Sequence, residues 1–109
     1  MAGHNRFNVS GTAALPVGSG GDEIAASIVF EISSASSLSF TPQLCLGGSG
    51  NTPADCAAYN VRTGATVPAG TAITADGVYA VYVPGCQLYL KPTAGTAVVD
   101  WAVVFGKVG

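Results

Sequence analysis

The sequence predicts an all-β fold, an antiparallel sandwich of two β-sheets. Charged residues make up 9% of the 109 residues, against about 25% in a typical soluble domain. The best helix formers are scarce, with two each of Glu, Lys, Arg and Gln, whereas Gly occurs 15 times; this balance favours strands and turns. Short segments of strand character also alternate with turn signals at hairpin-like spacing. A jelly roll is one form of such a sandwich, and a small closed β-barrel is the alternative.

We expect a single domain over residues 1–109. Its N-terminal third predicts two strands. We expect a flexible N-terminal arm over about residues 1–8, and a first strand over 6–15. The glycine-rich segment 16–23 is expected to be a loop. The next strand, over 24–32, alternates cleanly between a core face and a more polar face. Its expected core residues are Ile24, Ala26, Ile28, Phe30 and Ile32.

The middle of the chain predicts short strands joined by turns. The serine-rich segment 33–37 is expected to be a turn, followed by a strand over 37–46. Pro42 predicts a sheet edge or a bulge within that strand, because proline cannot donate to a ladder. We expect an exposed loop over 47–56 and a short strand over 57–63.

The C-terminal part predicts two hairpins. After a turn-rich connection over 64–70, a short strand at 71–75 leads into Asp76-Gly77, a strong hairpin signal. The strand VYAVYV follows at 78–83. The remaining elements are a turn at Pro84-Gly85, a strand at 86–92, a turn at 93–97 and a last strand at 98–108, with Val99, Trp101, Val103 and Phe105 on its bulky face.

The strand at 78–83 is apolar on both of its faces, whereas an antiparallel sheet facing water usually has one polar face. Two explanations stay open: a loop of the same chain covers the outer face, or a second subunit does. Tyrosine is favoured at interfaces because it offers a large rigid contact with a polar tip. Tyr79, Tyr82 and Tyr89 are therefore the tentative residues of an interface with another subunit or a partner.

The charge pattern excludes some partners. The net charge is −2 and there is no basic run, so we expect no nucleic-acid binding. The sequence has no stretch of 18 apolar residues, so we expect no membrane span. The N-terminus lacks the apolar core of a secretory signal. A surface this poor in charge is more typical of a protein packed into an assembly than of a free monomer.

The sequence contains no motif that indicates catalysis. His4 is the single histidine and lies near the terminus, and Asp22-Glu23 is expected to be a solvated loop pair. The acidic residues have no metal-ligand spacing. Asp100 lies inside an apolar strand. We expect it to pair with Lys91 or Lys107, or to face solvent at a sheet edge. We therefore expect a protein that is not an enzyme and has no cofactor and no metal.

Three cysteines, Cys45, Cys56 and Cys86, predict small thiols in a reducing compartment rather than a disulfide framework, because their number is odd. Cys45 and Cys56 flank a loop that can bring them together, so a bridge between these two stays open.

The C-terminal segment ADGVYAVYVPGCQLYLKPTAGTAVVDWAVVFG at 75–106 resembles small structural proteins of tailed-phage virions, and so does the short, charge-poor, Gly/Ala/Thr/Val-rich composition of the chain. Head decoration (capsid cement) proteins are the members that the chain resembles most. The resemblance rests on composition and general sequence pattern, not on a motif, so no functional residue is carried over from it. It implies a virion protein, made in the host cytoplasm, that binds the major capsid protein on the capsid surface, often as a homotrimer.

Two functions follow as expectations. The first is a non-enzymatic decoration protein that stabilises the assembled head shell. The alternative is a carbohydrate- or receptor-binding β-sandwich module of a phage tail or fibre, in which Trp101 and the tyrosines form a stacking platform for sugars. Trp101 shares a strand face with Val99 and Val103. This apolar face predicts that Trp101 lies in the core, which argues against the sugar platform.

Overall fold

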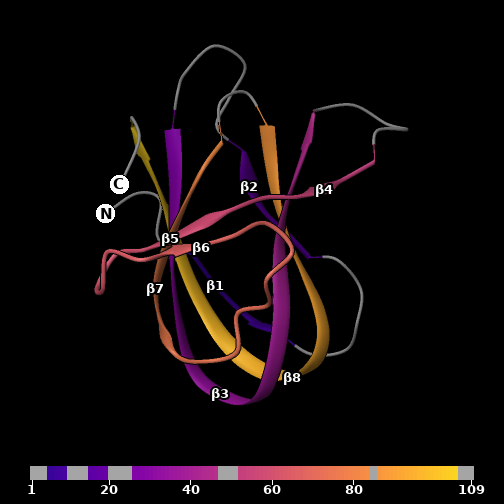
Figure 1. The fold of residues 1–109 in the computed structure, drawn as a ribbon, viewed down its shortest axis with the longest axis vertical. Helices are drawn as coiled ribbons and strands as arrows, with labels where there is room; N and C mark the ends of the chain where they lie inside the picture. The colour runs from indigo at the N-terminus through magenta and orange to yellow at the C-terminus, as the bar shows by residue number, and fades with distance from the viewer. Residues whose placement is uncertain (1–4, 10–14, 20–25, 47–51, 84–85, 106–109) are drawn as a thin grey trace.

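The computed structural model describes residues 5–9, 15–19, 26–46, 52–83 and 86–105. Within these residues the protein is all-β, without a helix, and forms one antiparallel sheet (Figure 1). Its strand order is β1-β8-β3-β7-β5-β6, with β2 also paired to β8 and β4 to β3. The strands are β1 (Asn5–Val9), β2 (Leu15–Ser19), β3 (Ala26–Leu46), β4 (Ala54–Asp55), β5 (Ala58–Asn60), β6 (Thr66–Val67), β7 (Gly77–Tyr82) and β8 (Cys86–Phe105).

Two long strands, β3 with 21 residues and β8 with 20, fold the sheet over on itself. They pair from Ala26 opposite Phe105 to Leu46 opposite Cys86. Ten residues of straight strand would span about 33 Å, yet the rings of Phe30 and Phe40 lie 6.3 Å apart. The strand therefore turns back, and Figure 1 shows β3 and β8 curving together. One half of the sheet faces the other across a shared core.

The corner of this fold lies where turns were predicted at 33–37 and 93–97. Both predictions are wrong, because these residues stay within β3 and β8 and bend them. Ser34 and Ser37 have left-handed φ values of 55° and 50°, and Gly95 has φ 80°. The β3–β8 register shifts between Ser33 and Phe40. The turn-forming residues thus make a bulged corner inside a ladder instead of ending it.

A carboxylate supports this corner from outside the two long strands. Ala35 N donates a hydrogen bond of 2.9 Å to Asp76 Oδ1. Asp76-Gly77 was predicted to turn a hairpin, and that prediction is wrong: Gly77 begins β7, which pairs with β3 and β5. Ile73, before the turn, instead forms an isolated bridge with Phe40, with backbone bonds of 3.2 and 2.8 Å.

The core confirms the alternation read from the strand over 24–32, since Ile28, Phe30 and Ile32 are fully buried. Ile24 lies outside the described residues. Val103, expected on the bulky core face of the last strand, is 40% exposed because it lies near the end of β8. The buried cluster draws on both halves of the sheet: Val9, Ile28, Phe30, Ile32, Leu38, Phe40, Ala58, Ile73, Tyr79, Val81, Val83, Leu88, Leu90, Ala97 and Val99.

Two other expectations change. The loop predicted over 16–23 contains β2, which pairs with β8 through a bulge between Pro16 and Gly18. Pro42 is not at a bulge: it lies in β3 opposite Leu90, one residue beyond the two-residue pairing of β3 with β4, and its carbonyl accepts a 3.0 Å bond from Cys56 N. The missing N–H of Pro42 costs little, because the neighbouring β4 is only two residues long.

The sheet is open. Along the described ladders β1 and β6 stand at opposite ends of the strand order, and no pairing joins them, so the closed-barrel alternative is wrong for this part of the chain. The arm expected over about residues 1–8 does not include residues 5–8, because they belong to β1 and pair with β8. Residues 1–4 lie outside the described residues.

Candidate functional site

The outward-pointing residues of β3, β7 and β8 form the surface that we call the outer face. Its members alternate with the core residues along each strand and are aligned by the ladders. Glu31 lies opposite both Val78 and Asp100, and Val29 lies opposite both Ala80 and Ala102. The outer face comprises Ser27, Val29, Glu31, Val78, Ala80, Tyr82, Asp100, Ala102 and Val104. Ser27 and Ala80 point to this side of the sheet but are buried.

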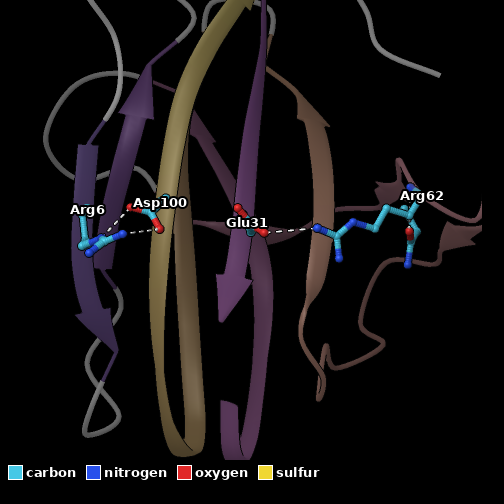
Figure 2. Close-up of polar contacts among 5 residues, drawn as sticks. Arg6, Glu31, Arg62 and Asp100 are labelled. Atoms are coloured by element: carbon cyan, nitrogen blue, oxygen red, sulfur yellow. Dashed lines mark hydrogen bonds and ion pairs between the residues drawn. The ribbon is translucent and has the colours of Figure 1, made fainter. Parts of the chain in front are cut away.

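A row of four charges crosses the outer face. Arg6 of β1 donates from Nε to Asp100 Oδ1 at 2.7 Å and from Nη2 to Oδ2 at 3.3 Å. Arg62, which follows β5, donates from Nη2 to Glu31 Oε2 at 3.1 Å. Figure 2 shows both arginines pointing inward toward the two central acids. The row therefore reads positive, negative, negative, positive, with no net charge.

The two arginines offset a conflict that the register creates. Glu31 and Asp100 occupy directly opposite positions of β3 and β8, and like charges in such positions destabilise a sheet. The side chain of Asp100 is 15% exposed, whereas that of Arg6 is 68% exposed. The hydrogen bond to Asp100, and then its opposite charge, raise the pKa of Arg6. Each acid has a guanidinium partner, so the central strands carry their charges as ion pairs.

A shallow hollow of about 330 Å³ lies beside this row. Apolar side chains make most of its lining, and the two acids form its polar side. Trp101 contributes to the lining and also packs against the core cluster. The complete lining is Val29, Glu31, Val78, Asp100, Trp101, Ala102 and Val104. A second hollow of about 420 Å³ lies near the corner and is lined by Asn8, Val9, Ser34, Thr96, Ala97 and Val98.

The three predicted interface tyrosines do not come together. Tyr79 is 6% exposed and stacks on Phe30 with ring centroids 5.8 Å apart, so it belongs to the core. Burial, and then the nearby Asp76 charge, raise the pKa of Tyr79. Tyr82 is half-buried on the outer face opposite Ser27. Tyr89 is half-buried in the other half of the sheet, opposite Gln43.

Sequence reasoning missed the charged row. Asp100 was expected to meet Lys91 or Lys107, or solvent; its partner is Arg6, 94 positions away in the chain. Lys107 lies outside the described residues. Asp100 did carry a signal, since it is an acid within an apolar strand. The pairing itself depends on the β1–β8 and β3–β8 registers, which the sequence does not state.

The described residues were compared with the side chains that commonly hold metal ions. They contain no cluster of three or more His, Cys, Asp or Glu side chains that can hold a metal ion. His4 and Asp22-Glu23 lie outside the described part of the chain. Cys45 is buried and Cys56 is half-buried, and both are thiols. The described residues also include no helix of the length and apolarity that crossing a bilayer requires.

Comparison of the chain with protein families, curated proteins and solved structures gives no match. The function therefore has to be inferred from the surface of the chain itself.

Proposed function

We propose that the chain is a non-enzymatic structural protein of a tailed-phage virion, a decoration protein that binds the outside of the assembled head shell and stabilises it. The observation that carries the proposal is the outer face. Apart from the buried Ser27 and Ala80, most of its positions are half-buried and apolar, with Val104 41% exposed, and its charges are already neutralised in ion pairs. The core of a protein interface is likewise apolar and depleted of unpaired charge.

The shape of this surface supports a macromolecular partner. The hollow is shallow and lies on the broad face of a sheet, so it suits a side chain of a partner protein better than it suits an enclosed substrate. Tyr82 lies on the same face and can add a half-buried aromatic contact there. Tyr89 lies in the other half of the sheet and would serve a second contact.

The stabilising effect needs no catalysis. A protein that binds the assembled shell and not the dispersed capsid subunits favours assembly by mass action, by about 1.4 kcal/mol for each tenfold excess over its dissociation constant. An oligomer that touches several capsid subunits gains further from effective concentration. A homotrimer is the copy number that the resemblance implies. The folded sheet supports a two-layer sandwich of jelly-roll type as the finer description of the fold.

Co-sedimentation with head shells of the encoding phage tests this function. The purified chain should pellet with shells assembled without it and stay in solution with dissociated capsid subunits. Val104→Asp places an unpaired charge on the outer face and should weaken pelleting at least tenfold. Val103→Asp is the matched control, because Val103 is equally exposed at 40% but points to the opposite side of β8. Pelleting with neither form of the capsid protein would contradict the proposal.

A carbohydrate- or receptor-binding module is the second candidate, and one observation favours it. The hollow places the carboxylates of Glu31 and Asp100 beside apolar side chains such as Val104, and a sugar has both hydroxyl groups and an apolar face. Trp101 is the single tryptophan and is among the residues that line this hollow, so its fluorescence can report binding there. Saturable changes with a panel of sugars would support this candidate, whereas insensitivity would favour the decoration protein.

A further inference from the structure

We infer that the hollow of about 330 Å³ on the outer face receives a basic side chain, lysine or arginine, of the capsid protein. This inference rests on the shell-binding function proposed above and names the group that the outer face recognises. The hollow is open to solvent, since the side chain of Glu31 is 51% exposed and Val104 is 41% exposed. A group of a partner can therefore enter it, and the arrangement of its lining indicates which kind of group it suits.

The β3–β8 ladder arranges the lining in three rows across the sheet. Glu31 and Asp100 form the first row, Val29 and Ala102 the second, and Val104 belongs to the third. Neighbouring rows are about 7 Å apart, because two strand residues of about 3.3 Å each separate them. The hollow therefore has a carboxylate end and an apolar end, which lie about 13 Å apart along β8.

The ion pairs leave the row of charges neutral but unevenly distributed. Both acids line the hollow, whereas neither of the two arginines does. Figure 2 shows Arg6 and Arg62 reaching the acids from the two outer sides. Arg62 bonds to Oε2 of Glu31, and Oε1 accepts no hydrogen bond from the residues that the structure describes. The carboxylate end thus presents negative charge, and an acceptor atom of Glu31, to a group that enters the hollow.

A basic side chain matches both ends of the hollow. Lysine and arginine lay an apolar stem along apolar surface and keep the charged head in a polar environment. The head donates to Glu31 Oε1, and the stem covers Val29 and Ala102. An apolar group would desolvate Glu31 Oε1 without giving it a partner, which costs free energy, and an acidic group would meet two carboxylates. Charge complementarity therefore selects a basic occupant. Val104 borders the stem, so a carboxylate placed there loses water without meeting the head.

The test is a titration of the purified chain with butylammonium, which has the four-carbon stem and the ammonium head of lysine, and with butanol, its uncharged counterpart. The backbone amide signals of Val29 and Ala102, followed by nuclear magnetic resonance, report on the hollow. We expect saturable shifts with a dissociation constant of millimolar order for butylammonium and weaker binding of butanol. Glu31→Gln should raise the butylammonium constant about twofold to fivefold, and about 1 M salt should remove this difference. Arg62→Gln withdraws the guanidinium from Glu31 and should lower the constant by a similar factor.

Asp55→Asn is the matched control, because it removes the same charge from an exposed acid of β4, in the other half of the sheet. It should leave the butylammonium constant unchanged. Equal melting temperatures of the variants would show that the fold is intact. The absence of a saturable shift, equal affinities for butylammonium and butanol, or a constant indifferent to both Glu31→Gln and Arg62→Gln would overturn the inference.

Co-sedimentation with head shells separates this inference from the function on which it rests. Glu31→Gln should weaken pelleting with the shells about twofold to fivefold, and Asp55→Asn should not. If the wild type and Glu31→Gln pellet equally well, the inference is wrong and the shell-binding function stands. If butylammonium binds as expected but the wild type does not pellet, the shell-binding function fails, and the capsid protein is not the source of the basic side chain.

Discussion

Replacing Gly95 with alanine should destabilise the protein far more than an ordinary glycine substitution, because Gly95 lies at the corner of the folded sheet. Its φ of 80° is left-handed, which costs a residue with a Cβ about 1–2 kcal/mol. A Cβ would also lie 2.5 Å from Ser36 O and closer still to the Ser37 carbonyl. Real Cβ atoms stay beyond 3.0 Å, so the β3 backbone must move by 0.5 Å or more.

The corner that must move is held in place by the hydrogen bond from Ala35 N to Asp76. Overpacking of this kind lowers stability by about 1–3 kcal/mol. We expect a total loss of about 3 kcal/mol, a large part of the 5–15 kcal/mol of a typical domain. For a chain of this length the melting temperature should fall by about 15 °C. Urea unfolding followed by circular dichroism measures the loss directly, provided that the slope with denaturant is unchanged.

Gly64→Ala separates the two contributions. Gly64 has a nearly equal φ of 79°, but a Cβ there meets only the Tyr59 hydroxyl at 3.8 Å. It should therefore lose about 1 kcal/mol from its backbone conformation alone. If Gly95→Ala were no more destabilising than Gly64→Ala, the close packing of β8 against the β3 corner would be refuted.

Three further predictions follow from the same structure. Asp76→Ala removes the acceptor of the Ala35 N–H bond and should lower the free energy of unfolding, measured in urea, by about 1 kcal/mol. Asp76→Asn should cause no loss, because the side-chain carbonyl of asparagine can accept the same bond. Burial raises the pKa of Tyr79, so the unfolded chain loses this proton first above about pH 10. Stability should fall there, and Tyr79→Phe should reduce the fall in urea midpoints between pH 9 and 11. Phe30→Ala empties a fully buried position between the two halves of the sheet and should cost about 3–5 kcal/mol by the same assay; a loss below 1 kcal/mol would contradict its place in the core.

The sequence was sufficient to predict the strand faces, because burial imposes a period of two on each strand. Ile28, Phe30 and Ile32 were assigned to the core from alternation alone, and all three are buried. The all-β class followed from composition and turn spacing. Faces are local properties, since each depends on a residue and its neighbours two positions away.

The corner was not predictable from the same signals. Ser34, Ser37 and Gly95 favour left-handed backbone, and a turn that ends a strand uses that conformation just as a bulged bend within one does. Only pairing with a second long strand distinguishes the two. Asp76-Gly77 was misread for a related reason: Asp76 serves as an acceptor for Ala35, far away in the sequence.

The candidate site depends on the register between strands that are far apart in the sequence, so only part of it could be predicted from the sequence. Asp100 stood out as an acid in an apolar strand, but Glu31 was not singled out, and Arg6 and Arg62 gave no sign of being the partners of these acids. A shift of one residue in the β1–β8 register would turn Arg6 to the other face. The apolar character of the outer face was foreseen, whereas the neutral charged row across it was not.

The most direct test of a stabilising role is the thermal melting of head shells assembled without this chain, followed as the purified chain is added back. If the chain decorates the shell, the melting temperature should rise continuously with the logarithm of its concentration above the dissociation constant, and Val104→Asp should shift the curve to higher concentrations. A melting temperature that stays constant up to a large excess of the chain would contradict the proposed function.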